Sequence, residues 1–406
     1  MSPNIPQHTP ITKRHVLYFS GFDPRGPAHY RRLYRAEAAR QAAVNGMPID
    51  FSKSEKNSPL ASGWKMHAQC DGSTVETTYE FMRWEDVISH HWPRNDLILM
   101  LRYLRALWHY LTTGVLWKIR KESIWMFIAA VYPAFLMLVV LGLGIGAVIG
   151  IDRLAQAAQL PRWLGLGAGL FGFGLIVQGG RMIERLSNSF WLARSMAFHT
   201  QQALGATPDL EVRLDEFAQY LANLVSESDA DEVLLVGHSS GAIIAAAVLG
   251  RALQRYPQLT AHRPRISLMT LGQCIPILSL FPQAQAFRAE LAAIAHADRI
   301  DWIDFTAPTD LACFVFLDTV ALAGIGHDNT EPRPKLLSAR FVTLFSAESY
   351  ARIRRSWYRN HFQYLMAGEK AGEYDYFAIT AGHLSLAERY RAKPSLDKSV
   401  LRKTKP

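Results

Sequence analysis

The sequence predicts an α/β fold, with a mostly parallel sheet flanked by helices and interrupted by two transmembrane helices. Three observations lead to this class. Short apolar or β-branched runs alternate with helical periodicity in both end portions of the chain. A glycine-flanked turn at 237–241 joins one such run to a helix. Two long uncharged stretches, 125–151 and 163–180, lie between the two end portions.

Residues 1–95 are expected to form the first part of the globular domain. Apolar alternation predicts its strands, and Gly, Pro, Asp and Asn mark its turns. The dipeptide Asp71-Gly72 suits a type I′ turn, so the strands beside it should form a hairpin that extends the sheet. The expected elements are a strand at 15–20, a loop at 21–26, a helix at 28–45 and hairpin strands at 64–70 and 73–81.

A transmembrane hairpin is predicted over residues 123–181. As a helix, 125–151 is roughly 40 Å long, which exceeds the ~30 Å hydrocarbon core of a bilayer. On the same basis 163–180 is about 27 Å long, although seven of its residues are glycine. Residues 96–122 mix leucine and tryptophan with arginine, which predicts one amphipathic helix at the membrane interface. Glycines spaced by four residues should form the faces through which the two spans pack, at 142, 146 and 150 and at 165 and 169.

Basic residues flank this hairpin on its outer sides and are sparse in its connector, which holds only Arg153 and Arg162. By the positive-inside rule, both long portions outside the hairpin are expected on the cytoplasmic side. The flanking basic residues are Arg102, Arg105, Lys118, Arg120, Lys121, Arg181, Arg185 and Arg194.

The composition agrees with membrane attachment. Hydrophobic residues make up 49% and charged residues 19%, which is apolar for a soluble protein. The net charge is +9, but much of the excess lies beside the apolar stretches and in a basic tail, 389–406, that we expect to be disordered. Anionic lipid is therefore the expected partner, and nucleic acid is not. The polar N-terminus predicts no signal peptide, and the three cysteines, at 70, 274 and 313, are expected to be buried residues.

Strand and helix alternate again through residues 182–388. This alternation predicts that the sheet continues with parallel strands and that an active site lies at their carboxyl ends. The expected elements are a helix at 210–224, a strand at 233–236, a strand at 265–271, a helix at 283–296, a strand at 299–305 and a final strand at 340–345.

The most informative motif is Gly237-His238-Ser239-Ser240-Gly241. A β-branched strand enters it and a helix of small residues leaves it. Because a serine hydroxyl is a poor nucleophile at neutral pH, it must sit on a tight turn where a neighbouring imidazole can take its proton. The two glycines leave room for that turn and for close packing of helix on strand. We interpret the motif as a nucleophile elbow that presents Ser239.

The elbow and the later acid and base candidates resemble the α/β-hydrolase superfamily, in which the triad follows the order serine, acid, histidine. The resemblance covers roughly residues 15–90 and 200–385. It implies an α/β-hydrolase fold and acyl transfer by a Ser-His-Asp triad.

The acid is expected to be Asp310, because 302–305 read as a strand and 307–310 as the loop beyond its carboxyl end. The alternatives are Asp304, within that strand, and Asp318. The base is expected to be His361, which follows the final predicted strand. His383, further along the chain, is the alternative base.

The oxyanion that forms in acyl transfer needs two preorganised N–H donors. One expected donor is the backbone N–H of Ser240. By the resemblance, the other comes from the loop after the first strand, from Phe22 or Gly21. In the same loop, Asp23 and Arg25 either pair and close the turn or contact the substrate.

Two other chemistries have weaker support. His296 and Asp301 have the spacing of the glycerolipid acyltransferase motif, but they fall where a helix ends and a strand begins, without that family's further motifs. His90-His91 adjoins no H-E-x-x-H motif and no carboxylate cluster. The sequence therefore predicts no metal and no cofactor.

These observations predict a membrane-anchored serine hydrolase that acts on carboxylic esters. Lipid-like esters are the favoured substrate class because the hairpin would hold the site beside the bilayer. Two alternatives stay open: a non-catalytic binding or scaffold module on a hydrolase fold, and an acyltransferase that uses the same triad. A scaffold predicts no serine-dependent turnover, and competing nucleophiles separate acyl transfer from hydrolysis.

Overall fold

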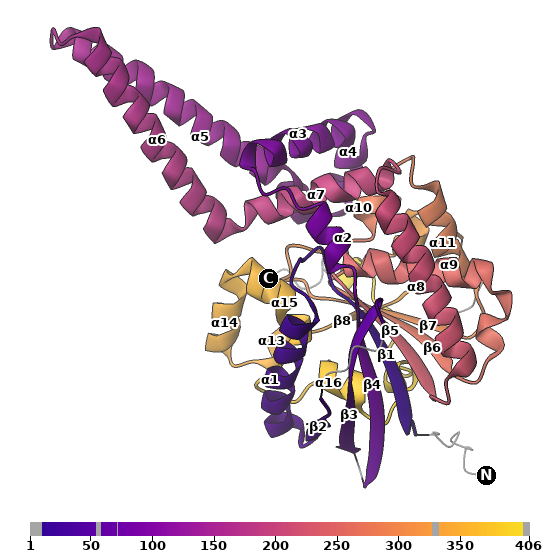
Figure 1. The fold of residues 1–406 in the computed structure, drawn as a ribbon. Coiled ribbons are helices and arrows are strands. Elements are labelled where there is room, and N and C mark those ends of the chain that lie inside the picture. The colour runs from indigo at the N-terminus through magenta and orange to yellow at the C-terminus, as the bar shows by residue number, and fades with distance from the viewer. Residues whose placement is uncertain (1–9, 54–57, 71, 327–332, 401–406) are drawn as a thin grey trace. The chain divides into compact units, whose positions relative to one another are not determined.

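The computed structural model describes residues 10–53, 58–70, 72–326 and 333–400. The chain divides into two compact units (Figure 1). The sheet unit comprises Met1–His91 and Gln201–Pro406, and the helical unit is Trp92–Thr200. The helical unit is therefore an insertion in the sheet unit, and it extends further on both sides than the predicted boundaries, 96 and 181.

The sheet unit contains an eight-stranded sheet with the order β2-β3-β4-β1-β5-β6-β7-β8. β1 pairs in parallel with both β4 and β5, and β5 to β8 continue in parallel. Among the strands that the structure describes, β2-β3 and β3-β4 are the antiparallel pairs. The predicted α/β class with a mostly parallel sheet is confirmed. The strands are β1 Lys13–Phe19, β2 Ile49–Phe51, β3 Ala61–Cys70, β4 Ser73–Met82, β5 Glu232–His238, β6 Arg265–Leu271, β7 Ile300–Thr306 and β8 Lys335–Ser338.

Helices flank this sheet. α9 packs on β1, β5 and β6 and is itself covered by α8 and α11 (Figure 1). From the C-terminal part of the chain, α16 contacts β1, β3 and β4, and α17 contacts β6 and β7. All seven residues of β5 are buried, as expected for a central parallel strand. The helices of this unit are α1 Pro27–Asn45, α2 Glu85–His90, α8 Pro208–Glu227, α9 Gly241–Arg255, η1 Pro257–Ala261, α10 Pro276–Ser279, α11 Gln285–His296, α12 Thr319–Leu322, α13 Phe341–Leu344, α14 Ala347–Arg355, α15 Trp357–Phe362, η2 Gln363–Leu365, α16 Tyr376–Ala381 and α17 Leu386–Arg389.

A buried ion pair joins the N-terminal and C-terminal parts of this sheet. Arg14 on β1 donates to Glu232 on β5 at 2.8 Å, and both side chains are fully buried. The same guanidinium donates to the carbonyl oxygens of Gly382 and Leu384 at 2.6 Å. A buried charge is tolerated when its hydrogen bonds are satisfied, as they are here.

The predicted hairpin is present as β3 and β4, with Val75, Thr77 and Tyr79 all buried on one face. Gly72 has φ +82°, the left-handed conformation that glycine favours in a tight turn. Asp71, the other residue of the predicted type I′ turn, lies outside the described residues.

The predicted final strand at 340–345 is wrong. The last strand is β8, which ends at Ser338, and the next residues form the short helix α13. Arg340 interrupts the extended chain with φ +42°, and Phe341 and Leu344 are both buried at helical spacing. The β-branched and aromatic residues of 340–345 favoured a strand by local propensity. A helical turn forms instead because it buries Phe341 and Leu344 on one face.

The basic tail, predicted to be disordered from residue 389, is held against the sheet unit at its start. Arg389 donates to the Ala378 carbonyl oxygen at 2.8 Å, and the Leu396 N–H donates to the Leu336 carbonyl oxygen at 2.8 Å. Residues 401–406 lie outside the described residues.

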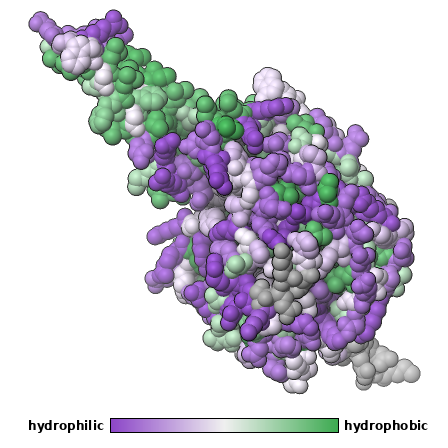
Figure 2. Space-filling model, viewed as in Figure 1, coloured by the Kyte–Doolittle hydropathy of each residue, from purple (hydrophilic) through white to green (hydrophobic). Residues whose placement is uncertain are grey.

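The helical unit contains two helices that are long and apolar enough to cross a membrane, α5 and α6. They lie side by side, and their surface carries exposed apolar side chains (Figures 1 and 2). The helices of this unit are α3 Asp96–Thr112, α4 Val115–Glu122, α5 Ile124–Ala157, α6 Arg162–Ser187 and α7 Ser189–Ala203, whose last residues belong to the sheet unit.

The single amphipathic helix predicted over 96–122 is two helices, α3 and α4. Gly114 separates them in the left-handed conformation, with φ +73°. The amphipathic pattern runs through both helices, so it gave no sign of this break. Glycine adopts positive φ without steric cost, and this permits the chain to turn between the helices.

The glycine prediction for the hairpin is correct for one helix and wrong for the other. A Cβ on Gly169 would lie 2.8 Å from the Cα of Val148, and one on Gly165 would lie 2.8 Å from the Cβ of Ala155. By contrast, a Cβ on residue 142, 146 or 150 would meet nothing within 4 Å. Gly144, outside the four-residue repeat, is instead the α5 glycine whose added Cβ would collide with α6, at Phe173.

This packing predicts opposite outcomes for two identical substitutions. Gly169→Ala should destabilise the hairpin by about 1–3 kcal/mol, because the new methyl group collides with the α5 backbone. Gly146→Ala should leave stability unchanged or raise it slightly, since the methyl group meets open space. Thermal unfolding of the two detergent-solubilised variants measures the difference, and equal unfolding midpoints would contradict this packing.

Candidate active site

Ser239 lies between β5 and α9 in a strained backbone conformation. Its φ is +60°, which is uncommon for any residue other than glycine. The Ser239 N–H donates to the carbonyl oxygen of Leu271, at the end of β6, at 2.8 Å. A serine held in the left-handed region between a strand and a helix has the conformation that a nucleophile elbow requires.

The glycines on either side of this turn are required by packing. A Cβ on Gly237 would lie 2.5 Å from the Cα of Ala242. A Cβ on Gly241 would collide with the carbonyl groups at the end of β1. Since both obstacles are backbone atoms, neither position can accept a larger residue without movement of the strand or the helix.

Asp310 and His361 form a buried pair. His361 Nδ1 lies 2.9 and 3.0 Å from the two carboxylate oxygens of Asp310, and both side chains are at most 1% exposed. Asp310 lies four residues past β7, and His361 is the penultimate residue of α15. Asn360 ties these segments together, because its side-chain amide donates to the Thr309 carbonyl oxygen.

The pair determines which nitrogen of His361 is available for chemistry. Because Nδ1–H donates to the carboxylate, neutral His361 presents the lone pair of Nε2. Nε2 is buried and has no hydrogen-bond partner within the described part of the chain. Buried polar atoms without partners are rare, and this one carries a lone pair that can accept a proton.

Ser239 belongs to the same neighbourhood. Its Oγ lies 3.9 Å from Cys274 Sγ, which lies 3.3 Å from the carbonyl oxygen of Ala312. The N–H of Ala312 donates to Asp310 at 3.0 Å. The structure therefore brings Ser239 and Asp310 to one region at the carboxyl ends of the parallel strands.

A second series of contacts reaches His361 from the elbow. The ring of His238, the residue before Ser239, lies 5.0 Å from the ring of His361 between centroids. His238 Nε2–H donates to the His361 carbonyl oxygen at 2.9 Å. His361 thus contacts the residue next to Ser239 in the chain, whereas Ser239 Oγ and His361 Nε2 form no hydrogen bond with each other among the described residues.

Burial and neighbouring charges shift the pKa values of Asp310 and His238 in ways that fix their charge at neutral pH. Burial alone would raise the pKa of Asp310, but the charge of His361 and the hydrogen bonds that Asp310 accepts hold this pKa below its usual value. Asp310 is therefore ionised at neutral pH. Burial and the charge of His361 lower the pKa of His238 to about 3, so His238 stays neutral.

The alternative residues occupy other places. Asp304 lies within β7, where it accepts from Thr270 at 2.6 Å, and burial raises its pKa to about 8. Asp318 caps α12 by accepting from two backbone N–H groups. The carbonyl of His383 accepts from Ile11, just before β1, so His383 lies at the opposite end of the sheet from Ser239.

The predicted oxyanion donors are close to Ser239, but one is occupied. A Cβ on Gly21 would lie 3.1 Å from the Cβ of Ser239, so this loop borders the elbow. Ser240 is the N-cap of α9, and N–H groups at a helix start have no acceptor within the helix. The Phe22 N–H, however, donates to the side-chain Oγ of Ser240 at 2.8 Å.

This contact predicts an unusual result for Ser240→Ala. Removing the hydroxyl frees the Phe22 N–H for an oxyanion and leaves the backbone N–H of residue 240 in place. For the ester hydrolysis that the sequence predicts, we expect kcat to rise by a factor of about 2–10, since one oxyanion donor contributes ~10²–10³ when fully used. Steady-state kinetics measure this change, and a fall in kcat of tenfold or more would show that the hydroxyl assists the reaction.

Asp23 and Arg25 pair with each other, which was one of the two roles predicted for them. Arg25 Nε lies 2.8 and 2.9 Å from the two carboxylate oxygens of Asp23. The guanidinium also donates to the Tyr358 hydroxyl at 2.5 Å and lies 5.3 Å from the ring centre of Phe362. Tyr358 and Phe362 belong to α15, so this pair also supports the helix that carries His361.

Sequence reasoning missed three residues that build the site. Asn360 holds the acid and base segments together. Tyr364 accepts from the Ala307 N–H at 2.9 Å, which fixes the loop that leads to Asp310. A Cβ on Gly272 would lie 2.9 Å from Asp310 Oδ2, so only glycine fits there. The position of Asn360 beside His361 was the one sequence signal for these roles.

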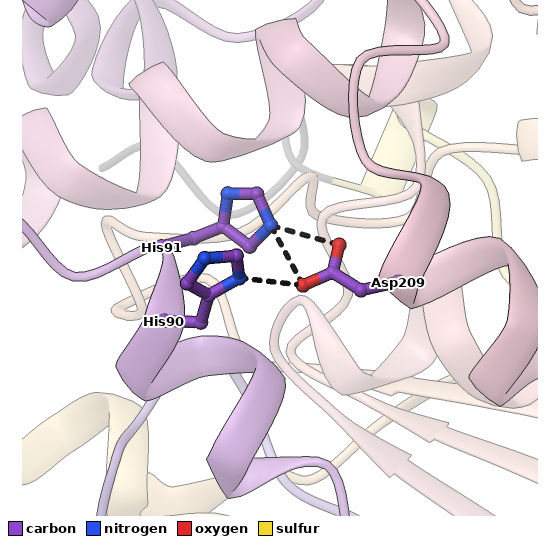
Figure 3. Close-up of side chains that lie close together, drawn as sticks. All are labelled: His90, His91 and Asp209. Atoms are coloured by element: carbon purple, nitrogen blue, oxygen red, sulfur yellow. Dashed lines mark hydrogen bonds and ion pairs between the residues drawn. The ribbon is translucent and has the colours of Figure 1, made fainter.

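Another group of side chains has the composition of a metal site. His90, His91 and Asp209 converge in the sheet unit, and their possible ligand atoms all lie within 4.8 Å of one another (Figure 3). The weaker acyltransferase motif does not form a comparable group. His296 bonds to the Gly326 carbonyl oxygen at 3.1 Å, whereas Asp301 pairs with Arg265.

Comparisons with known proteins add no assignment. No family model, curated protein sequence or solved structure matches the chain. The function proposed below therefore depends on the geometry of the site and on the sequence.

Proposed function

We propose that this protein is a membrane-anchored serine hydrolase that cleaves carboxylic esters. The observation that carries the proposal is the buried Asp310–His361 pair, whose Nε2 is unpartnered within the described residues, in the same region of the sheet edge as a serine on a strained strand-to-helix turn. Such a turn, with an imidazole oriented by a carboxylate, supplies the nucleophile and the base that acyl transfer needs.

The reaction proceeds in two acyl-transfer steps. Ser239 Oγ attacks the ester carbonyl carbon while His361 Nε2 takes the hydroxyl proton, and Asp310 stabilises the resulting imidazolium. The Ser240 N–H donates to the oxyanion. Collapse of the tetrahedral intermediate breaks the bond to the leaving oxygen, which takes the proton from His361. Water then attacks the acyl-enzyme with His361 again as base, which releases the acid and restores Ser239.

The topology supports an α/β-hydrolase fold for the sheet unit. Three features agree with the resemblance: the elbow follows a central parallel strand, the oxyanion loop follows the neighbouring strand β1, and the acid and base follow later in the order Ser, Asp, His. The antiparallel strands β2 and β3 extend one edge of the sheet.

The helical unit supports attachment to a bilayer. α5 and α6 are long enough to span it, and their apolar side chains are exposed, as lipid contact requires (Figure 2). The basic residues on the outer sides of the hairpin favour a cytoplasmic sheet unit. A hydrolase tethered to a bilayer meets lipid-like esters at high local concentration, so we propose these as the substrate class.

One observation favours the alternative of a non-catalytic binding or scaffold module. Ser239 is 7% exposed, Asp310 2% and His361 1%, and the Phe22 N–H is taken by Ser240. A substrate therefore needs movement of the surrounding segments to reach Oγ. A module that does not turn over substrate would not need this movement.

Labelling with a fluorophosphonate probe tests the proposal. The detergent-purified full chain is treated with the probe, digested, and analysed by mass spectrometry, alongside turnover of a series of short and long acyl esters. We expect the label on the peptide containing Ser239 and a preference for long acyl chains. A folded protein that neither reacts nor turns over any ester would favour the binding module. Product analysis with added alcohol separates hydrolysis from acyl transfer.

A further inference from the structure

We propose that His90, His91 and Asp209 bind a divalent transition-metal ion, with Zn²⁺ as the best fit, and that this ion clasps together the two chain connections between the sheet unit and the helical unit. The site lies outside the Ser239 region, and the proposal does not depend on hydrolase activity. The sequence shows no carboxylate cluster adjoining these two histidines, but the structure brings the Asp209 carboxylate to both of them.

The geometry suits one tetrahedral ion. His90 Nδ1 lies 2.9 Å from Asp209 Oδ2, and His91 Nε2 lies 2.9 Å from Oδ1 and 3.1 Å from Oδ2. Figure 3 shows both rings pointing at the carboxylate. Ligand atoms 2.0–2.1 Å from a tetrahedral Zn²⁺ lie roughly 3.3 Å from one another. The carboxylate–nitrogen distances are already close to this value, and the two imidazole nitrogens lie within 4.8 Å of each other, so rotation of the exposed His90 side chain can complete the coordination.

The donor types also match. Two imidazoles and one carboxylate are ligands that Zn²⁺ prefers, and a fourth position remains for water. His90 is 75% exposed and His91 10%, so an ion can enter from solvent while one ligand is held firmly. The Leu210 N–H donates to Asp209 at 3.0 Å, an outer contact that orients the carboxylate.

The positions of the three ligands in the sequence mean that a bound ion would link the two ends of the helical insertion. His91 is the last residue of the sheet unit before the insertion, and Asp209 lies eight positions after Gln201, where the chain re-enters that unit. An ion held by both sides closes a loop of more than one hundred residues. Such a closure restricts the ends of the insertion in the same manner as a disulfide or a metal clip.

Zinc binding to the metal-free full chain tests the proposal. The protein is purified in detergent without a histidine tag, stripped with EDTA and titrated with ZnCl₂ by calorimetry, and Co²⁺ is added separately to read its visible absorption. We expect one Zn²⁺ per chain, a tetrahedral Co²⁺ spectrum and a higher thermal midpoint with Zn²⁺ present.

Three variants make the result specific. His90→Ala carries little risk to the fold because His90 is largely exposed, and Asp209→Asn keeps an oxygen acceptor while it removes the charge. Each should weaken Zn²⁺ binding at least about tenfold, whereas His67→Ala, which removes an exposed histidine on β3, should not. No stoichiometric Zn²⁺ binding by the wild type, or equal binding by all the variants, would overturn the proposal.

Discussion

Ser239→Ala is expected to reduce kcat for ester hydrolysis by about 10⁶-fold and to abolish fluorophosphonate labelling. The variant keeps the backbone donors but has no atom that can form the acyl-enzyme. Because the side chain is small and, among the described residues, its Oγ makes only a 3.9 Å contact with Cys274, the fold should be unchanged. Active-site titration and steady-state kinetics measure both effects.

Ser226→Ala is the matched control for this loss. Ser226 lies on α8 and is exposed, and within the described parts of the chain its hydroxyl makes one local hydrogen bond, which it donates to the Asn223 carbonyl oxygen. Labelling and turnover of this variant should equal those of the wild type. Turnover that survived in Ser239→Ala would show that Ser239 is not the nucleophile and would refute the proposed mechanism.

Asp310→Asn is expected to lower kcat by about 10⁴-fold with little change in KM. An asparagine amide can donate to Nδ1, which favours the tautomer with the proton on Nε2 and removes the lone pair that must accept the Ser239 proton. The buried imidazolium also loses its counter-charge. A single-turnover acylation experiment isolates this step.

Asp304→Asn provides a control of the same chemical change in the neighbouring strand. With a pKa of about 8 the Asp304 carboxyl is neutral in the folded protein at pH 7, so an amide of similar shape should preserve activity. The unfolded chain releases this proton above pH ~4, which makes wild-type stability fall as pH rises from about 4 to 8. We therefore expect the thermal midpoint of Asp304→Asn to exceed that of the wild type by an amount that grows with pH. Loss of turnover in Asp304→Asn would instead make Asp304 the acid.

Much of the fold could be predicted from local pattern. The strands at β1, β5, β6 and β7 and the helices α1, α8 and α11 lie within a few residues of the expected bounds, because a buried strand and an amphipathic helix have different periods. Errors arose where tertiary burial overrides propensity. The run after Arg340 has the composition of a strand, yet Phe341 and Leu344 are buried together on a helical turn.

The candidate site also has one part that local sequence predicts and another that only the structure shows. Ser239 could be identified because the elbow requires glycines and small residues nearby in the sequence. The choice of Asp310 and His361 depended on chain order, and only the structure brings them into contact. Two features of the structure could not be read from local pattern, because they join side chains about 120 or more residues apart. One is the hydrogen bond from the Phe22 N–H to Ser240, and the other is the cluster of His90, His91 and Asp209.

The interrupted sheet has a consequence for biogenesis. β1 pairs with β4 on one side and with β5 on the other, and the entire helical unit is synthesised between β4 and β5. If α5 and α6 enter a bilayer as proposed, their insertion begins while one edge of β1 is still unpaired and Arg14 still lacks Glu232. The nascent N-terminal strands must stay soluble, or be held by a chaperone, until β5 has been synthesised. A stalled chain that ends before β5 should expose this edge to proteases and chaperones, and a chain that includes β5 and the residues after it should protect it.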